Sequence, residues 1–243
     1  MSVLFLFSAS NVWSSNLHIA AASNFTATMR SLQTTFEQRS GHSLTISYGS
    51  SGQLYTQIRN GAPFEVFLSA DKFRPQKLSQ DGYAVIESRF TYALGQIALW
   101  HAKKGSDINA QTLINAHIQK RLATANPKHA PYGVAAMETL KRLDVYDLWK
   151  KRIITGQNVA QAQQFIASGH VSLGFIAYSQ ILSLASEKQG SHWLVPTRYH
   201  SPLAQQLVVL KKGEANPLSF EFLEFLKSPE AQSIMQNFGY ITP

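Results

Sequence analysis

The segment Leu17–Phe25 reads Leu-His-Ile-Ala-Ala-Ala-Ser-Asn-Phe and indicates how the whole chain is built. Its middle, Ile19–Ala22, consists of small apolar residues and predicts a short buried strand. Ser23 and Asn24 are residue types that often cap helices. Apolar side chains then recur at helical spacing in Phe25, Met29, Leu32 and Phe36. A strand that runs into a capped helix leaves free backbone N–H groups at one point, and such a point suits an anion.

The same kind of turn recurs three times further along the chain. Gly49-Ser50-Ser51-Gly52 lies between an extended segment and a helical pattern. Pro131-Tyr132-Gly133 opens another helical pattern, and Asn158 with Val159 opens a further one. Each turn alone is explained as an ordinary helix start. Together, their hydroxyl, amide and backbone N–H groups predict a binding site for a small, fully deprotonated oxyanion, because no charged partner or acceptor stands among them.

Strand and helix patterns alternate along most of the chain, which predicts an α/β fold with largely parallel sheets. These units are more numerous than one small sheet needs. We therefore predict two lobes joined by two extended crossing segments, near Phe90–Leu94 and Pro202–Leu210. Residues 16–91 and 211–243 are assigned to lobe I and residues 92–210 to lobe II. A ligand would bind in the cleft between the lobes.

The composition is that of an ordinary globular protein. Hydrophobic residues make up 44% of the 243 residues and charged residues 15%, with a net charge of +8. The Lys and Arg residues are scattered, which is typical of a solvated surface. They form no basic patch with interleaved aromatic residues, so we expect no nucleic-acid partner. The chain has no cysteine, which excludes disulfides, thiolate nucleophiles and cysteine-held metals.

Motifs for catalysis or for a resident cofactor are missing from the sequence. It contains no Walker loop, no Gly-x-Gly-x-x-Gly and no His-Glu-x-x-His. Ser50 and Ser51 lie between glycines but lack the spacing of a nucleophile elbow. Asp71 is typical of a helix cap, and His129 is the one histidine beside a predicted turn. We expect no catalytic residue, no metal directly held by the protein, no cofactor and no enzymatic activity.

The N-terminus resembles the end of a secretion signal. Val3–Ala9 is a short apolar run, and Val12-Trp13-Ser14 is a loose small-x-small cleavage pattern, although a positively charged start is missing. Residues 1–15 are therefore interpreted as a signal-peptide remnant, and we expect the protein in the periplasm. The sequence contains no run of 18 apolar residues, so no transmembrane span is predicted.

Five motifs give the chain a family resemblance. They are Ala-Ala-Ala-Ser-Asn-Phe (20–25), Tyr-Gly-Ser-Ser-Gly (48–52), Asn-Gly-Ala-Pro-Phe-Glu-Val-Phe-Leu-Ser-Ala-Asp (60–71), Asn-Pro-Lys-His-Ala-Pro-Tyr-Gly-Val-Ala-Ala (126–136) and Leu-Gly-Phe-Ile-Ala (173–177). In this order they closely resemble the periplasmic molybdate-binding proteins of molybdate ABC transporters. The resemblance implies a two-lobed type II periplasmic binding protein fold that closes on molybdate or tungstate. A membrane ABC permease is the implied partner, and we expect a monomer.

The resemblance also implies which residues contact the ligand. They are Ser23, Asn24, Ser51, Tyr132 and, through its backbone N–H, Val159. Ser50, Asn158 and Tyr178 form a second group of candidates. Other family members place a tyrosine where this chain has Ala177, so Tyr178 stands one residue away from that position. A different small anion, such as sulfate or an organic acid, stays open as the alternative ligand.

Overall fold

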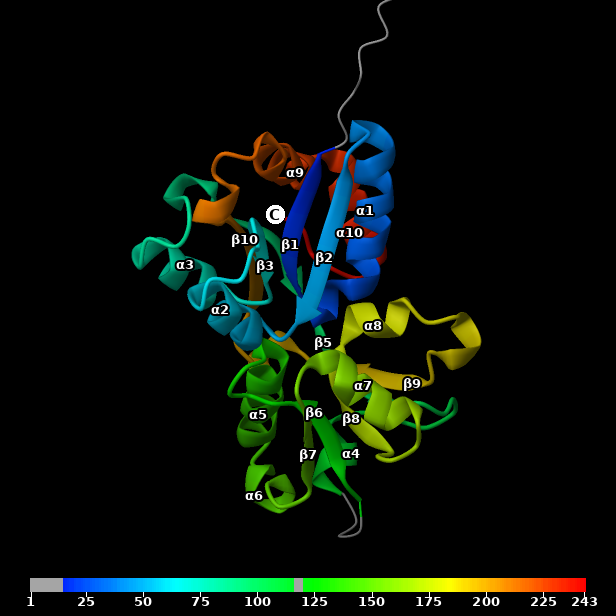
Figure 1. The fold of residues 1–243 in the computed structure, drawn as a ribbon. Coiled ribbons are helices and arrows are strands. Elements are labelled where there is room, and N and C mark those ends of the chain that lie inside the picture. Colours follow the sequence, from blue (N-terminus) through cyan, green and yellow to red (C-terminus); the bar gives the residue numbers. More distant parts are fainter. Residues whose placement is uncertain (1–14, 116–119) are drawn as a thin grey trace, which may run out of the picture.

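The computed structural model describes residues 15–115 and 120–243, so the predicted signal segment lies outside the described residues apart from Ser15. Two five-stranded sheets, each with helices against it, form two lobes stacked one above the other (Figure 1). This arrangement confirms the predicted α/β, two-lobed fold. No helix in the described ranges has the length and apolar character needed to cross a membrane.

The sheet of lobe I has the strand order β2-β1-β3-β10-β4. Its strands are β1 (Asn16–Ala22), β2 (Ser43–Gly49), β3 (Val66–Ser69), β4 (Phe90–Gly95) and β10 (Leu203–Val209). The strand β1 runs parallel to β2 and β3, whereas β10 is antiparallel to β3 and β4. The lobe also contains the helices α1 (Thr26–Ser40), α2 (Ser51–Arg59), α3 (Phe73–Gln80), α9 (Pro217–Lys227) and α10 (Pro229–Asn237).

Both faces of β1 are buried over residues 19–22, which explains why this part of the strand is continuously apolar. Ile19 and Ala21 belong to the core that includes Phe36 of α1 and Phe222 of α9. Ala20, which points the other way, belongs to the core formed with α2 and α3. Alternating strand residues face opposite sides of a sheet, so helices on both sides require small apolar residues throughout.

The sheet of lobe II has the strand order β7-β6-β8-β5-β9. Its strands are β5 (Ile97–His101), β6 (Leu122–Ala125), β7 (Ile153–Gly156), β8 (Leu173–Ala177) and β9 (Ser191–Leu194). The helices of this lobe are α4 (Ala110–Ile114), α5 (Pro131–Arg142), α6 (Tyr146–Trp149), α7 (Val159–Ala167) and α8 (Tyr178–Leu182). Short 3-10 turns complete the chain at η1 (Ser23–Phe25), η2 (Ile86–Ser88), η3 (Ser186–Lys188), η4 (Thr197–Tyr199) and η5 (Lys211–Gly213).

The chain crosses between the lobes at different residues from those predicted. Residues 92–95 and 203–209, which we assigned to lobe II, are strand residues in the sheet of lobe I. One crossing is the single residue Gln96, between β4 and β5, and the other is the segment 195–202. The sequence 92–100 is apolar and extended on both sides of Gln96, so its pattern does not mark where the chain changes sheets.

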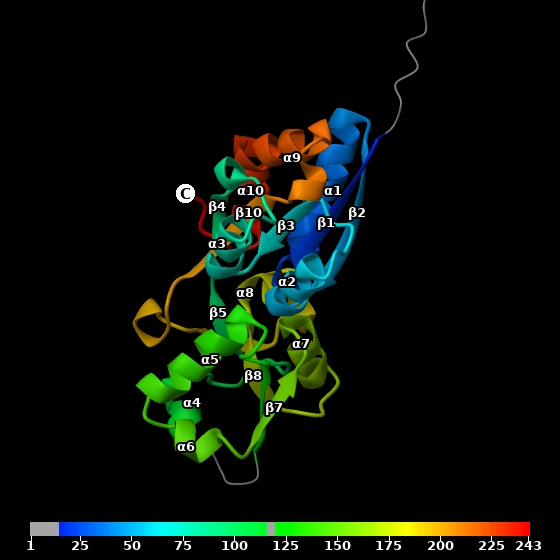
Figure 2. The same cartoon turned by 60° about the vertical axis from the view of Figure 1, so that its left-hand side comes forward.

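The C-terminal segment returns to this hinge. Ile241 exchanges backbone hydrogen bonds with Leu94 at N–O distances of 3.1 and 2.7 Å. The amide of Gln96 donates to the carbonyl oxygen of Gly239 at 2.7 Å. Figure 2 shows the C-terminal end beside β4. The chain end therefore packs against the crossing strand and forms part of the hinge.

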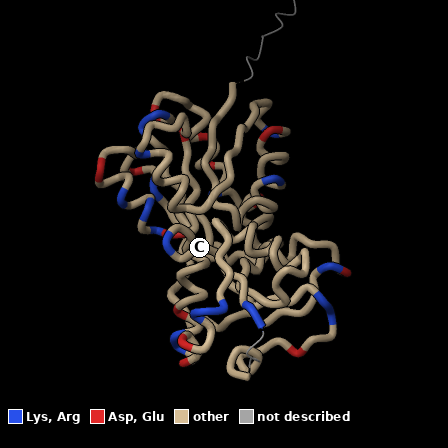
Figure 3. Tube along the Cα trace, turned by 60° about the horizontal axis from the view of Figure 1, so that its bottom comes forward, with Lys and Arg blue, Asp and Glu red and all other residues tan. Residues whose placement is uncertain are grey.

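Charged residues are spread over the molecule. Lys and Arg occur on both lobes and are interspersed with Asp and Glu (Figure 3). The described ion pairs are all between residues on or near the surface of one helix or turn, apart from Arg39 with Glu230, which joins α1 to α10. The positive net charge is thus distributed over both lobes and is not gathered in one patch.

Candidate functional site

Figure 1 shows the waist between the two lobes, below α2 and above α5. A small cavity lies between the lobes and is lined by residues at the starts of α2, α5 and α7. We call it the central cavity. Its lining residues are Ala22, Ser23, Asn24, Gly49, Ser50, Ser51, Ala70, Ala130, Pro131, Tyr132 and Val159. It contains about 190 Å³ of empty space. The cavity volume open to a water-sized sphere is only about 10 Å³, whereas pockets for drug-sized ligands measure about 300–1,000 Å³, so this cavity suits a small ion.

The N-terminus of α2 supplies two serines with different roles. The Ser50 hydroxyl is used within the helix: its oxygen accepts the Gln53 N–H in a capping box, and its proton is donated to Gln53 Oε1 at 2.8 Å. The Ser51 hydroxyl oxygen accepts the Ala70 N–H at 2.9 Å. Its own proton has no acceptor among the described residues. Ser51 is 1% exposed, so this proton is available only to something inside the cavity.

Lobe II contributes the N-termini of α5 and α7. Tyr132 is the second residue of α5, after Pro131, which fits the first helical position because it has no N–H to satisfy. Val159 is the first residue of α7, and the Asn158 side chain caps that helix by accepting the Gln161 N–H at 3.0 Å. The backbone N–H groups of Tyr132 and Val159 precede the first hydrogen bonds of their helices. Both N-termini therefore direct N–H donors and partial positive charge toward the cavity.

The first predicted turn is built differently from our expectation. Ser23 and Asn24 do not cap α1 with their side chains; they form the 3-10 turn η1 instead. The Ser23 hydroxyl makes no hydrogen bond with the described residues and stays available to the cavity. The Asn24 amide group donates to Gln205 Oε1 at 2.9 Å and to the Tyr240 hydroxyl at 3.0 Å. Both amide hydrogens are thus occupied within the protein, although Asn24 itself lines the cavity, and its contact with a ligand stays a prediction.

The lobes are held together in a closed arrangement around the cavity. The Gly52 N–H of α2 donates to the His129 carbonyl oxygen of lobe II at 2.8 Å. The Ser179 hydroxyl of α8 donates to the Asn24 carbonyl oxygen of lobe I at 3.0 Å. A Cβ atom on Gly52 would lie 2.8 Å from the His129 Cα atom. The close approach of the lobes therefore depends on the missing side chain at position 52.

Two residues of the second group of candidates stand outside the cavity. Asn158 caps α7 and faces a separate groove. Tyr178 begins α8, and its ring packs against His192 at a centroid distance of 5.4 Å and against Gly239. The one-residue offset from the family position thus turns the Tyr178 side chain away from the site. Ser50 lines the cavity, and its contact with a ligand stays a prediction.

Sequence reasoning missed Gln205 and Tyr240. Gln205 is fully buried on β10 and Tyr240 is 3% exposed near the C-terminus. Neither stands at a strand-to-helix turn, which was the signal we searched for. Polar side chains in an otherwise apolar strand, as in Leu-Ala-Gln-Gln-Leu-Val-Val (203–209), are a signal that would have pointed to Gln205.

Burial keeps the tyrosines near the site in their neutral form. It raises the pKa of Tyr132 and of Tyr92 well above the usual value of 10. Burial also raises the pKa of Tyr240 to about 12, against hydrogen bonds that act in the opposite direction. These phenols are therefore donors at physiological pH. The described residues contain no group of three or more His, Asp or Glu side chains arranged to hold a metal ion.

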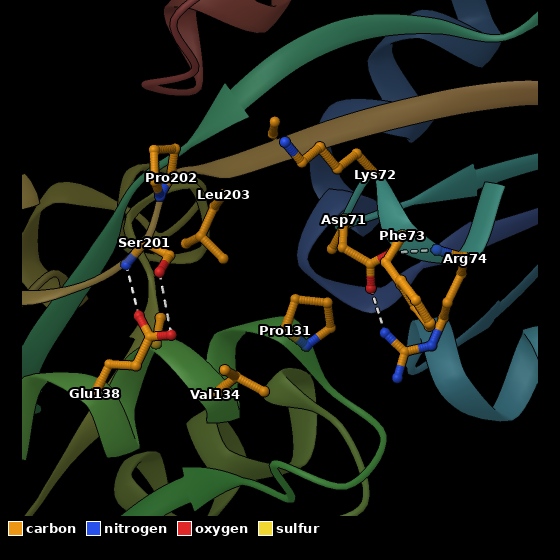
Figure 4. A pocket seen from close by; sticks show the side chains of 13 residues that line it. Asp71, Lys72, Phe73, Arg74, Pro131, Val134, Glu138, Ser201, Pro202 and Leu203 are labelled. Carbon is orange, nitrogen blue, oxygen red and sulfur yellow. Dashed lines mark hydrogen bonds and ion pairs between the residues drawn. The ribbon is translucent and has the colours of Figure 1, made fainter. Parts of the chain in front are cut away.

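A second space, which we call the side groove, lies next to the central cavity and shares Ala70 and Pro131 with it. Figure 4 shows side chains from both lobes around it. Asp71 forms an ion pair with Arg74, and the Glu138 carboxylate accepts the N–H and hydroxyl of Ser201. The side groove contains about 660 Å³ of empty space. It is larger than the central cavity.

Comparisons with known proteins find bacterial solute-binding proteins that resemble this chain over most of its length. The sequence profile described as "Bacterial extracellular solute-binding protein" matches residues 17–241. The molybdate-binding protein ModA of Azotobacter vinelandii is 42% identical over 92% of this chain and 89% of its own length. ModA of Rhodobacter capsulatus is also 42% identical, over 92% and 87% of the two chains. A solved structure of the Azotobacter vinelandii periplasmic molybdate-binding protein superposes with a TM-score of 0.89 at 39% identity, covering 93% of this chain and 99% of that one.

Proposed function

The chain belongs to the bacterial extracellular solute-binding protein family, and on that premise we propose that it captures molybdate between its lobes for delivery to a membrane ABC permease. The relatives named above are binding proteins, and molybdate is the ligand in their names. We infer that this chain likewise acts by binding, without catalysis, outside the cytoplasm. We further infer that it works as a monomer and uses neither a resident cofactor nor nucleic acid.

The observation that carries the proposal is the set of unused hydrogen-bond donors around the central cavity. The hydroxyls of Ser23 and Ser51 and the N–H groups of Tyr132 and Val159 converge there without acceptors from the described residues. Each hydrogen bond to a charged group contributes about 1.5–3 kcal/mol. A dianion that accepts several of them would bind tightly although no charged side chain lines the cavity.

The donors come from both lobes, which links binding to closure. Ser23 and Ser51 belong to lobe I, and Tyr132 and Val159 belong to lobe II. Only a closed arrangement brings all of them to one ion, so the ligand stabilises the closed state by its difference in affinity for the two states. A permease that recognises the closed form would then receive loaded protein in preference to empty protein.

The chemistry of the lining favours a fully deprotonated oxyanion. Molybdate and tungstate carry no proton near neutral pH and only accept hydrogen bonds, so we propose that both bind. Phosphate retains a proton that needs an acceptor, and no carboxylate lines the central cavity. An unmade hydrogen bond of this kind costs about 1–3 kcal/mol.

Calorimetric titration of the purified protein with molybdate, tungstate, sulfate and phosphate tests the proposal. We expect tight binding of molybdate and tungstate and a melting temperature that rises as RT ln(1 + [L]/Kd) predicts. Phosphate should produce no heat of binding. Absence of binding with both molybdate and tungstate would overturn the proposal, and tighter binding of sulfate or an organic acid would favour that ligand instead.

A further inference from the structure

We propose that Gln205 is a positioning residue for the ligand, because it fixes the Tyr132 phenol so that its proton faces the central cavity. This inference rests on the proposed function and adds to it a residue that does not itself line the cavity. Gln205 lies on β10 in lobe I and Tyr132 on α5 in lobe II. The two side chains meet behind the cavity, with Gln205 Nε2 3.3 Å from the Tyr132 hydroxyl oxygen.

The orientation of the Gln205 amide is set by its neighbours in lobe I. Its Oε1 atom accepts two hydrogen bonds, from Asn24 Nδ2 at 2.9 Å and from the Tyr92 hydroxyl at 3.0 Å. An oxygen that receives two donors cannot exchange places with the amide nitrogen without losing both bonds. The Nε2 atom therefore faces Tyr132 and donates to it.

This donation determines what the Tyr132 hydroxyl can offer to a ligand. Because its oxygen already accepts from Gln205, its remaining strong contact is the donation of its own proton. No described residue accepts that proton, and Tyr132 is 2% exposed and lines the cavity. The phenol is thus a donor that a deprotonated oxyanion satisfies. An anion whose own proton points at Tyr132 finds no favourable partner there.

The residue at position 95 makes room for this contact. A Cβ atom on Gly95 would lie 2.3 Å from the Tyr132 hydroxyl oxygen and 2.4 Å from Gln205 Nε2. Gly95 is the last residue of β4, directly before the crossing at Gln96. The chain therefore lacks a side chain where the amide and the phenol approach each other at the hinge.

The closing of the lobes is linked to the same contact. Asn24, Tyr92 and Gln205 all belong to lobe I, so they stay together when the lobes separate. Tyr132 moves with lobe II and meets Gln205 only in the closed arrangement. The Tyr132 proton is consequently aimed at the ligand when the cavity is complete. Gln205 acts on the ligand through Tyr132 rather than by direct contact.

A double-mutant cycle tests whether Gln205 acts through Tyr132. The unaltered chain, Gln205→Met, Tyr132→Phe and the double variant are titrated with molybdate by calorimetry. We expect each single variant to bind about tenfold more weakly, the effect of one hydrogen bond to a charged group. In the Tyr132→Phe background, Gln205→Met should change the Kd by less than about threefold, because the group it positions is gone.

Gln206→Met is the matched control, since Gln206 is buried on the same strand. Its side chain accepts from Arg89 at 3.0 Å and donates to Thr91 at 3.0 Å, both within lobe I. This variant should lose stability without ligand but keep its molybdate affinity. If Gln205→Met does not fold, Gln205→Glu replaces it. The carboxylate has nearly the same shape as the Gln205 amide, but it accepts the Tyr132 proton that the ligand would otherwise receive. Molybdate binding should therefore weaken to a similar extent.

The possible outcomes separate this inference from the proposed function. An unaltered chain that binds no molybdate overturns both. An unaltered chain that binds, together with a Gln205 variant of equal affinity, overturns only the role of Gln205. Independent effects of Gln205→Met and Tyr132→Phe that add in the double variant would also overturn it, because they would show that Gln205 does not act through the phenol.

Discussion

The central cavity and the side groove both lie between the lobes, yet they use their polar groups in opposite ways. The side groove contains charges, and three of them have partners within the protein, in the ion pair Asp71–Arg74 and in Glu138 with Ser201 (Figure 4). No charged side chain of the described residues lines the central cavity, but the hydroxyls of Ser23 and Ser51 and the N–H groups of Tyr132 and Val159 have no acceptor among those residues. The proposed anion site therefore rests on unsatisfied buried donors rather than on net charge.

This difference follows from the cost of burial. A buried ion needs a partner, and leaving it unpaired is expensive, so a charged binding site would destabilise the empty protein. Helix N-termini provide oriented N–H groups and partial positive charge with smaller desolvation costs. The N-termini of α2, α5 and α7 thus supply donors to the cavity without placing a charged side chain in its lining.

The largest expected effect comes from preventing the lobes from closing on the central cavity. In Gly52→Ala the new methyl group would lie 2.8 Å from the His129 Cα atom, so the contact between α2 and lobe II cannot form. We expect molybdate affinity to fall by at least about 100-fold, because donors of one lobe alone would hold the ion and each lost bond is worth about 1.5–3 kcal/mol. Calorimetry measures this loss.

The stability of the ligand-free variant serves as the control for Gly52→Ala. Alanine is favoured over glycine within a helix by about 1 kcal/mol, so the melting temperature without ligand should stay the same or rise. A lower melting temperature together with unchanged affinity would show that the contact between Gly52 and His129 is not needed for binding.

The next largest effect distinguishes two adjacent serines at the same helix end. Ser51→Ala should weaken molybdate binding by about 1.5–3 kcal/mol, since the free hydroxyl proton is lost. Ser50→Ala removes the capping box and should lower stability by about 1 kcal/mol with a much smaller change in affinity. Calorimetry and thermal unfolding of both variants measure the two effects. If Ser51→Ala binds molybdate as tightly as the unaltered chain, Ser51 does not contact the ligand.

The sequence predicted the fold and most of the lining because both follow from local patterns. The small apolar residues before a polar turn predicted β1. Similar turns predicted the helix starts at Ser51, Tyr132 and Val159, which line the cavity. Helix N-termini are local features with residue preferences that can be read directly. Their meeting at one cavity was inferred from the resemblance and from the general position of ligands in open α/β sheets.

The network behind the cavity could not be predicted in this way because its members are far apart in sequence. Asn24 and Gln205 are separated by 181 residues, and Asn24 and Tyr240 by 216. Asn24 was expected to face the ligand with its side chain, but these distant partners occupy its amide group. The chain crosses between the lobes at Gln96 because β4 and β5 belong to different sheets. The apolar pattern is the same in both strands, so it does not show where one sheet ends and the other begins.

A smaller effect tests whether the paired charges of the side groove influence the central cavity. The Arg74 guanidinium lies next to the start of α2, 3.0 Å from where a Gly52 Cβ atom would be, and Asp71 neutralises it. In Asp71→Asn this positive charge is left unbalanced. We expect anion affinity to rise about two- to fivefold at low salt, the scale of an ordinary surface ion pair. The gain should shrink at high salt, where charges are screened.

Asp81→Asn is the matched control for that experiment. It breaks the pair of Asp81 with Lys77 at the other end of α3, at an N–O distance of 2.7 Å, and Asp81 does not line the central cavity. Its affinity should equal that of the unaltered chain at every salt concentration. A similar gain in both variants would indicate a general effect of net charge rather than an effect of Arg74.

The smallest expected effect is that of pH on binding. No His, Asp, Glu, Lys or Arg side chain lines the central cavity, and burial raises the pKa of Tyr132 well above 10. Affinity measured by calorimetry should therefore be nearly constant from pH 6 to 9. A steep decrease in that range would implicate a titrating neighbour such as His129, whose backbone already contacts Gly52.

Stability, in contrast to affinity, should fall at alkaline pH. Tyrosines in the unfolded chain lose their protons near pH 10, whereas burial raises the pKa of folded Tyr240 to about 12. Between these values the unfolded state binds fewer protons than the folded state, so the free energy of unfolding decreases as pH rises. The slope reaches about 1.4 kcal/mol per pH unit for each such tyrosine. Urea unfolding at pH 9 and pH 11 measures it, and Tyr240→Phe should reduce the slope because one of the coupled protons is removed.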